Sequence, residues 1–511
     1  MPHGDGLRSP QEPGAINRSQ MERIPMAEPR QTFGERNFGG ADLGDVRRSR
    51  RLPDLVDEMQ RHPGGTLPQK LPRREDLEAF YRLCEAQDVT HAAVIEVHRR
   101  RTLQFLQAVD CFVLAIHDAT ELDYTSHASL ERDLGQIGNG THRGYIVQNT
   151  LVVDPLRGAV VGLANQILHI RPAVPKKETQ AQRRRRKSRE SRLWLRGTED
   201  LPRRREVVDV CDRGADTFEF LEHEAASGRT FVVRSAYNRG IQIGHETGGS
   251  RALLHDYART LPVLERCELA VSQKVLVKKP KRGGKKTRTI RTKRIAQLNV
   301  AAAPLLLLAP ASKNGEHGNQ PLSLWIVRVW EASPPPGEEG LEWFLLTNHP
   351  ASLGEEALRV KTWYEWRWTI EEYHKGMKTG CGIESLQFQY VDRLEPAIGI
   401  LSILTLTLLA LRSASRHPQA RTRLAEDAID ADYIEVLALW RHRDLRPHWT
   451  VYDFYMALGR LGGHQGRKKD PPPGWLVLWR GWEKLQLMLD GARAAKLRQQ
   501  LQLNQTPNKC A

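Results

Sequence analysis

The sequence has few cysteines, and no two of them form a CxxC pair. They lie scattered over 511 residues, at Cys84, Cys111, Cys211, Cys267, Cys381 and Cys510. Such spacing matches neither a zinc-binding pattern nor a disulfide framework. We therefore expect a protein of a reducing compartment, the cytoplasm.

Long apolar runs are also missing. The longest, Ile398 to Leu411, contains Ser402, Thr405 and Thr407, and it is shorter than the roughly 20 residues that a membrane-spanning helix needs. The first residues do not resemble a secretory signal. We therefore predict a buried core helix here and no membrane partner.

Acidic residues are fewer than basic ones. The chain has 77 Lys and Arg against 61 Asp and Glu, which gives a net charge of +16. A surface this basic suggests a polyanion partner, most often nucleic acid, although a basic surface that only aids solubility has the same charge. The length allows two to four domains.

Basic residues are concentrated near the start of the chain. Residues 1–30 have the composition of a disordered extension, with Met1, Met21 or Met26 as the true start. Residues 31–108 show helical spacing, and Arg47, Arg48, Arg50 and Arg51 precede an apolar helix face. This pattern is typical of a helical DNA-binding domain, or of a charged surface helix.

Two acids follow apolar strands. The run Cys111–Asp118 reads as a buried strand, and further strands are expected at 121–127, 144–154 and 159–170. A second apolar strand ends at Asp212, before a helix over about 215–227 and a strand at 231–234. Asp212 can also be an ordinary helix N-cap. The alternation indicates an α/β core whose first part spans 109–235.

Residues 236–345 have an interrupted β pattern, which we interpret as an inserted β subdomain. Strands are expected at 269–278, 287–300, 304–308, 324–330 and 341–347. Lys278–Lys286 is a basic hairpin tip. The basic run Arg183–Lys187 is expected on a surface loop whose role the sequence does not reveal.

The second part of the core, residues 346–415, contains one helix that runs from Trp363 to Lys378. Because a helix turns about 100° per residue, five polar side chains share one stripe: Tyr364, Arg367, Glu371, Lys375 and Lys378. A carboxylate there can hold a divalent metal and the cations can hold phosphates. A solvated face with ion pairs is the alternative.

Residues 416–511 are predicted to be helical. Trp475, Trp479 and Trp482 form a stripe that suggests helix–helix packing, either within the chain or between subunits. Packing within the chain is the commoner explanation of such a stripe.

Asp118, Asp212 and Glu371 together suggest a chemistry. Three convergent carboxylates can hold two Mg²⁺ ions, and such a pair promotes phosphodiester displacement. At these positions the chain resembles the DDE transposases of the insertion sequence 4 family. Tyr364-x2-Arg367-x3-Glu371-x6-Lys378 has the type and spacing of that family's Y-R-E-K signature.

The other segments that resemble the family cover nearly the whole chain, from about 33 to 495. They are Leu43–Arg48, Ile116–Tyr124, Val210–Asp216, Phe231–Ser235, Met456–Gly463 and Leu478–Trp482. The sequence departs from the family at Gly144–Ile146, where an aromatic pair is expected, and in the additional run Arg183–Lys187.

The resemblance implies an RNase H-like catalytic core flanked by helical N- and C-terminal domains, the latter (416–511) for dimerisation. It implies that Asp118, Asp212 and Glu371 bind two Mg²⁺, with Mn²⁺ as a substitute. It also implies DNA contacts from further residues: Tyr364, Arg367, Lys375, Lys378, Arg234, Arg47, Arg48 and Trp343. Trp343 stands where the family places an indole that stacks on a flipped-out base; a strand-core residue is the alternative.

The implied reaction is cut-and-paste transposition in a bacterial cytoplasm. A homodimer would hold two double-stranded transposon ends, cleave each through a hairpin intermediate and join the 3′-hydroxyls to target DNA. Two alternatives stay open: a transposase-derived DNA-binding protein that no longer cuts, and an RNase H-like nuclease without strand transfer. The terminal inverted repeat, the target preference and the element's present mobility cannot be read from the sequence.

Overall fold

The computed structural model describes residues 31–62, 64–138, 140–173, 177–179, 182, 186, 188–244, 248–271, 273–278, 286–311, 317–416, 418–444, 448–467, 470 and 472–505. The expected extension 1–30 lies outside these residues. So do the tip of the basic hairpin at 279–285 and, apart from Arg186, the run Arg183–Lys187.

The N-terminal part is helical, as predicted. It contains α1 (Phe33–Phe38), α2 (Val46–Arg61), α3 (Leu67–Lys70), α4 (Arg74–Cys84) and α5 (His91–Ala108). The side chains of Asp45 and Thr90 accept hydrogen bonds from backbone N–H groups at the starts of α2 and α5, which fixes where these helices begin. The apolar side of α2 is buried and its arginines lie on the other side.

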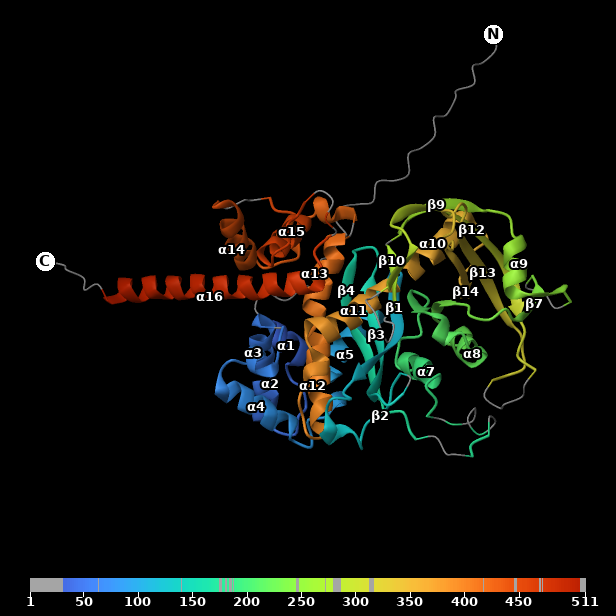
Figure 1. The fold of residues 1–511 in the computed structure, drawn as a ribbon. Coiled ribbons are helices and arrows are strands. Elements are labelled where there is room, and N and C mark those ends of the chain that lie inside the picture. Colours follow the sequence, from blue (N-terminus) through green and yellow to red (C-terminus); the bar gives the residue numbers. More distant parts are fainter. Residues whose placement is uncertain are drawn as a thin grey trace, which may run out of the picture.

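A mixed β-sheet forms the centre of the molecule (Figure 1). Its first strands are β1 (Val113–Asp123), β2 (Gly135–Gln136), β3 (Arg143–Asp154), β4 (Ala159–His169), β5 (Val207–Cys211) and β6 (Thr230–Arg234). β1 pairs antiparallel with β3 and parallel with β5, and β5 pairs parallel with β6. This mixed sheet, with helices at both ends of the chain, agrees with the predicted α/β class.

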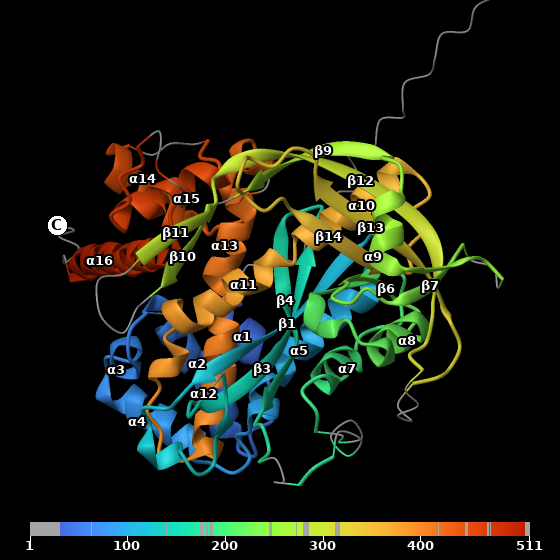
Figure 2. The same ribbon diagram turned by 45° about the vertical axis from the view of Figure 1, so that its right-hand side comes forward.

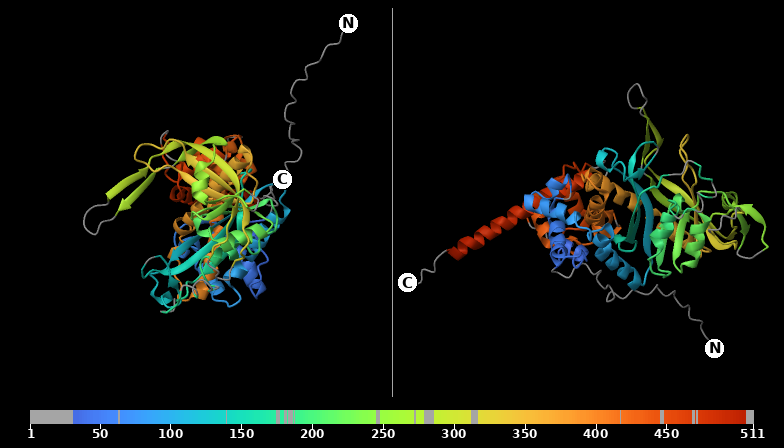
Figure 3. Two further views of the ribbon diagram at one scale, coloured as in Figure 1. Left: turned by 90° about the vertical axis from the view of Figure 1, so that its right-hand side faces the viewer. Right: turned by 90° about the horizontal axis from the view of Figure 1, so that it is seen from below.

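The inserted segment extends this sheet instead of standing apart from it. Its strands are β7 (Gly240–Ile243), β8 (Arg251–Leu253), β9 (Glu265–Val271), β12 (Arg294–Leu307), β13 (Leu322–Glu331) and β14 (Glu342–Thr347). Strand β14 pairs with β6, so the sheet order runs β2-β3-β1-β5-β6-β14-β13-β12-β7-β8. Only β10 (Lys274–Lys278) and β11 (Lys286–Arg291) form a separate ribbon, which projects from the body (Figures 2 and 3).

Three expected strand boundaries are wrong. The strands expected at 111–118 and 121–127 are one strand, β1, because its pairing with β3 continues from Leu114 to Asp123. The strands expected at 287–300 and 304–308 are divided differently, since β12 passes through Pro304 while paired to β13. The strand expected at 269–278 is interrupted between β9 and β10.

Helices cover both faces of the sheet (Figure 2). The helices α7 (Arg192–Thr198), α8 (Phe218–Ala226) and α9 (Leu254–Thr260) lie on one face. The other face carries α10 (Gly354–Glu365), α11 (Trp368–Lys375) and α12 (Val391–Leu404). Because side chains alternate along a strand, Ile116 and Val210 join the core on the α10–α12 side, and Cys211 joins the core around α8.

The helix predicted over 363–378 is not continuous. α10 ends at Glu365, α11 begins at Trp368, and a π-helical turn over Gly376–Gly380 follows. Arg367 therefore lies in the link between the two helices. Proline and glycine are absent from this link, so the break has no sequence signal of the usual kind.

The apolar run of the sequence forms α12 and α13 (Leu406–Arg416). By length and composition the stretch Val391–Ser413 could cross a membrane, but 78% of its 18-residue apolar window is buried inside the protein. That is the environment of a core helix, as predicted.

The C-terminal part contains α14 (Ala431–His442), α15 (Val451–Leu461) and the long helix α16 (Trp475–Gln505). The tryptophan stripe packs within the chain, since Trp475, Trp479 and Trp482 are only 2%, 3% and 6% exposed. The second half of α16 projects away from the body (Figures 1 and 3) and is exposed.

His98 on α5 joins the N-terminal helices to the sheet. Its Nδ1 lies 2.8 Å from the Asn37 side-chain oxygen, and its Nε2 accepts from the Leu163 backbone N–H at 2.9 Å. The ring must therefore be neutral, and burial lowers the pKa of His98 to about 3.

This burial predicts a pH-dependent stability. Below about pH 6.5 the unfolded chain takes up a proton at His98 that the folded protein does not bind until about pH 3. The free energy of unfolding should therefore fall with pH, by about 2 kcal/mol between pH 6.5 and pH 5 from this residue. In thermal melts at several pH values, His98→Gln should lose less stability between pH 6.5 and pH 5 than the wild type does. An unchanged pH dependence would contradict a neutral, buried His98.

Candidate active site

Asp118 lies on β1, on the face covered by α11. It stands in the middle of the strand and not at its end, which corrects the expectation from the sequence. The parallel pairing of β1 with β5 nevertheless stops at His117, one residue earlier, so one edge of β1 is open at Asp118. The strand continues because β3 still pairs with its other edge.

Asp212 directly follows β5, where the sequence placed it. Its side chain accepts a hydrogen bond from the Gly214 N–H at 2.7 Å and so caps the short helical turn Arg213–Ala215. One carboxylate oxygen remains for another ligand. The helix-cap role and a role in the site are therefore compatible.

Glu371 on α11 reaches the same place through Arg367. The Arg367 guanidinium lies 2.5 Å from the Glu371 carboxylate and 3.4 Å from that of Asp118. Arg367 lies at the break between α10 and α11, and its side chain points toward Asp118 on the sheet. One arginine thus bridges two of the three acids.

The surroundings of Asp118 disfavour its charged form. The pKa of Asp118 is raised to about 7, first by burial and then by the negative charges of Asp212 and Glu371, while Arg367 opposes the increase. A carboxyl group in this position is stabilised in its charged form by any additional cation.

These three side chains suit a hard divalent cation chemically, because carboxylate oxygens are the donors that Mg²⁺ prefers. Within the described residues, no three His, Cys, Asp or Glu side chains are close enough to form a metal site as they stand. Arg367 stands between two of the acids and balances part of their charge. A cation at this site would replace that positive charge.

Three further predicted residues lie together beside the acids. The Tyr364 hydroxyl interacts with Arg234 and Arg367, and burial raises the pKa of Tyr364 while both arginines lower it. Trp343 on β14 packs edge-to-face on Tyr364, with ring centroids 5.4 Å apart, and is half-buried. The Arg234 guanidinium donates to the Glu342 carbonyl at 3.2 Å.

The predicted lysines occupy the end of this surface. Lys375 ends α11 and is exposed. Lys378 lies in the π-helical turn, 3.6 Å from Glu384. The next residue to Arg367 is Trp368, which sequence reasoning did not select; it is 56% exposed, and the Arg367 guanidinium carbon lies 5.5 Å from its ring centroid.

Arg47 and Arg48 lie on α2, away from the acids in the fold (Figure 1). Arg47 is 92% exposed and pairs with Asp45 at 2.9 Å. Arg48 pairs with Asp88 at 3.6 Å. The structure therefore does not bring these two residues together with the other predicted site residues.

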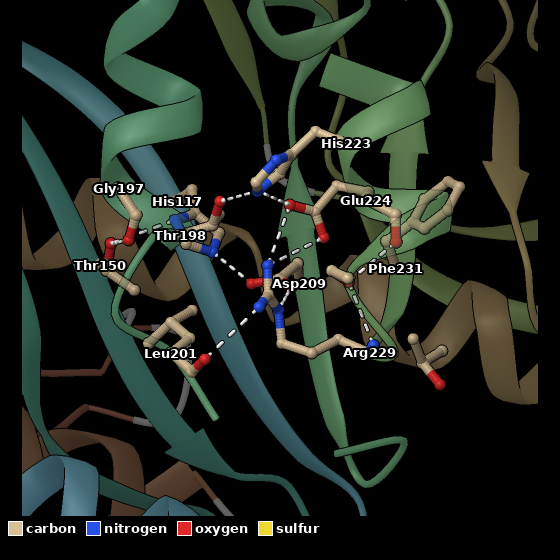
Figure 4. A network of polar contacts seen from close by, with 12 residues as sticks. His117, Thr150, Gly197, Thr198, Leu201, Asp209, His223, Glu224, Arg229 and Phe231 are labelled. Carbon is tan, nitrogen blue, oxygen red and sulfur yellow. Dashed lines mark hydrogen bonds and ion pairs between the residues drawn. The ribbon is translucent and has the colours of Figure 1, made fainter. Parts of the chain in front are cut away.

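A buried polar network supports the acid-bearing strands from behind (Figure 4). His117 points away from Asp118 and binds Asp209 on β5 at 2.7 Å and Thr150 on β3 at 3.1 Å. Arg229, 3% exposed, donates to Asp209 at 2.5 Å and to Glu224. The network links the three neighbouring strands β3, β1 and β5.

The two acids of this network have pKa values shifted in opposite directions. Burial is the largest influence on both acids, but Arg229 lowers the pKa of Asp209 overall, while the pKa of Glu224 is raised by burial and then by Asp209. Its members lie up to 92 residues apart along the chain, as His117 and Asp209 do, so no local pattern could have revealed the whole network.

One comparison with known proteins bears on this site. Residues 30–89 match the family model for the transposase DNA-binding domain. The matched segment contains α1 to α4 and ends just before α5, so Arg47 and Arg48 lie inside it. The match supports a transposase, and it supports DNA as the partner of this chain.

Proposed function

We propose that this protein is a DDE transposase of the insertion sequence 4 family, with an RNase H-like catalytic core. The observation that supports the proposal is that Arg367 bridges Asp118 and Glu371, while the negative charge of Asp212, at the end of the neighbouring strand, raises the pKa of Asp118. The transposase DNA-binding match at 30–89 supplies a domain that would deliver DNA to them.

In this proposal the three acids would hold two Mg²⁺ ions, for which Mn²⁺ can substitute. The chemistry that such ions supply is activation of a water or a 3′-hydroxyl and stabilisation of the leaving oxygen. Tyr364, Arg367, Lys375 and Lys378 would bind phosphates of the transposon end, and Arg367 would exchange its carboxylate partners for one of them.

The reaction would follow the cut-and-paste order. Water attack nicks one strand at the transposon end, and the freed 3′-hydroxyl attacks the opposite strand, which releases flanking DNA and leaves a hairpin. Hydrolysis opens the hairpin, and the restored 3′-hydroxyl attacks target DNA. A homodimer that holds two ends would carry this out in the bacterial cytoplasm, where chromosomal DNA lies.

A plasmid that carries the element's two inverted repeats tests the proposal. With Mg²⁺ the protein should cut at both ends and produce fragments that run as hairpins on a denaturing gel. Specific binding without cutting would identify a DNA-binding descendant that no longer cleaves. Cutting without hairpins would identify a nuclease. Either result would overturn the proposed reaction.

Trp343 has a distinct expected role at the hairpin step. Tight bending of one strand onto the other is easier when a base leaves the stack, and an indole can hold such a base with roughly 1–3 kcal/mol. Trp343 is half-buried against Tyr364. The exposed part of its indole ring is therefore available to stack on a base. Trp343→Ala should nick nearly normally and lose hairpin formation at least about tenfold.

The control for Trp343 is Trp330→Ala, a half-buried tryptophan on the adjacent strand β13 that lies against Arg328. It should leave the ratio of hairpin to nick unchanged. An abasic site at the flipped position should partly rescue Trp343→Ala. A stable Trp343→Ala protein with a normal hairpin yield would eliminate the stacking role.

A further inference from the structure

A chain of buried side-chain hydrogen bonds runs from α5 to α11. His91 Nε2 lies 2.9 Å from the Gln166 side-chain oxygen, and Gln166 Nε2 donates to the Asn149 side-chain oxygen at 2.8 Å. Asn149 Nδ2 lies 3.1 Å from His374 Nε2. A branch joins Gln166 Nε2 to the Ser402 hydroxyl of α12 at 3.0 Å. We call His91, Gln166, Asn149 and His374 the polar chain.

The donors and acceptors of the polar chain have only one consistent assignment. An amide nitrogen can only donate and an amide oxygen can only accept, so His91 donates from Nε2 and His374 accepts at Nε2. Acceptance at Nε2 requires a neutral His374 ring, whereas His91 can donate from Nε2 in either charge state. Burial, the largest cause, lowers the pKa of His91 and lowers that of His374 to about 3, which agrees with this assignment.

The polar chain meets both sides of the candidate active site. Asn149 on β3 is the register partner of Asp118 on β1. His374 lies three residues after Glu371 on α11, less than one helical turn away. The bond between Asn149 and His374 therefore connects the strand beside one acid to the helix that carries another.

The other end of the polar chain is anchored near the N-terminal domain. His91 is the first residue of α5, which begins two residues after the matched segment 30–89. His98 on the same helix binds Asn37 inside that segment. The polar chain thus fixes α11 to a helix that is itself tied to the DNA-binding domain.

The arrangement has a mechanical consequence for Glu371. Asn149 and Gln166 are 0% and 4% exposed and His374 is 8% exposed, so water cannot readily replace a lost partner. Rotation of α11 about its axis would break the bond from Asn149 to His374 and would also carry Glu371 away from Asp118. A catalytic carboxylate tolerates displacement of only about 0.5 Å.

We propose that Asn149 and His374 are positioning residues, which set the rotation of α11 and so hold Glu371 opposite Asp118, with Gln166 and His91 as their anchor on α5. This inference rests on the proposed function for its catalytic consequence. The effect on α11 itself does not depend on which reaction the protein carries out.

The test compares His374→Leu with His374→Gln in the full-length protein. Leucine removes the acceptor, whereas the glutamine side-chain oxygen can accept the same bond. His374→Leu should bind Mn²⁺ about 10- to 100-fold more weakly in calorimetry. It should also lower kcat for end nicking by a similar factor, leave KM unchanged and speed amide exchange in α11. His374→Gln should restore most of each quantity.

Gln148→Leu is the matched control. Gln148 is the neighbour of Asn149 on β3, is 1% exposed, points to the other face, and has a side-chain amide without a hydrogen-bond partner among the described residues. It should leave Mn²⁺ affinity, kcat and α11 exchange unchanged. A change as large as that of His374→Leu would show that these readouts report general destabilisation and would overturn the proposal.

Asn149→Leu keeps the test decisive if His374→Leu does not fold. Leucine has the branched shape of asparagine but can neither accept from Gln166 nor donate to His374, so both bonds of Asn149 in the polar chain are lost. It should reproduce the loss of Mn²⁺ affinity and the faster exchange. Wild-type values in a folded Asn149→Leu protein, or a His374→Gln protein as impaired as the His374→Leu protein, would overturn the inference.

Failure of the inference and failure of the proposed function can be told apart. Amide exchange of α11 is measured without DNA and without metal, so it responds to the polar chain alone. If the wild-type protein neither bound Mn²⁺ nor cut DNA, the proposed function would fail while the exchange result would stand.

Discussion

Replacement of Glu371 by glutamine should lower strand cleavage by on the order of a thousandfold or more while specific end binding stays within about twofold. Binding depends mainly on cations that meet phosphates, whereas cleavage depends on the carboxylates. The Glu371 side chain is 37% exposed and the glutamine oxygen can still accept from Arg367, so the variant should fold normally. Asp118→Asn and Asp212→Asn should behave alike.

The control for this prediction is Glu365→Gln. Glu365 ends α10, close to Glu371 in sequence, but pairs with Lys361 at 2.7 Å and not with the acids. Its replacement should leave cleavage near the wild-type rate. Mg²⁺-dependent cutting by Glu371→Gln at more than a few per cent of that rate would remove Glu371 from the site.

Truncation of α16 should have two different effects, depending on where the chain ends. A protein truncated after Asp470 lacks Trp475, Trp479 and Trp482, whose indoles are buried in the full chain. The Trp475 ring N–H donates to Glu372 on α11 at 2.9 Å, and that of Trp482 donates to the Gln60 carbonyl of α2 at 2.9 Å. Since a buried tryptophan contributes about 3–5 kcal/mol, this protein should melt early and lose every activity together.

A protein truncated after Asp490 should instead keep its fold. The removed half of α16 is exposed and carries Leu497 and Leu501, which are 57% and 52% exposed. We propose that it holds the second copy of the chain in the paired-end complex. This protein should melt like the full chain and bind single ends. Native gels and light scattering should show no paired-end complex of this protein. If the 1–490 protein does form that complex, the dimer contact lies elsewhere.

The sequence predicted the elements whose signal is local. The apolar runs before Asp118 and Asp212 form β1 and β5, and the helical spacing near Arg47 forms α2 inside the matched DNA-binding segment. Such signals need only a few consecutive residues. The three acids were predicted from the same local signals, and the fold places Asp118 and Glu371 on either side of Arg367.

What the sequence could not reveal depends on partners far away in the chain. β1 runs past Asp118 because β3 pairs with it, and one strand's pattern does not show how far its neighbour extends. The break before Trp368 leaves Arg367 free to bridge two acids, although nothing in the link resembles a helix breaker. The tryptophan stripe is compatible with an internal or an intersubunit contact, because its partner Glu372 lies 103 residues away from Trp475 in the chain.

Joining of a precleaved transposon end to target DNA is the most direct test of the central claim. The inverted repeats that flank the coding region supply the end, which is prepared with a free 3′-hydroxyl and incubated with protein, Mg²⁺ and a supercoiled target plasmid. A transposase should give covalently joined products in which the 3′-hydroxyl of the end is attached to target DNA, and Glu371→Gln should give none. Specific binding of the end with target DNA left unjoined, or merely nicked, would contradict it.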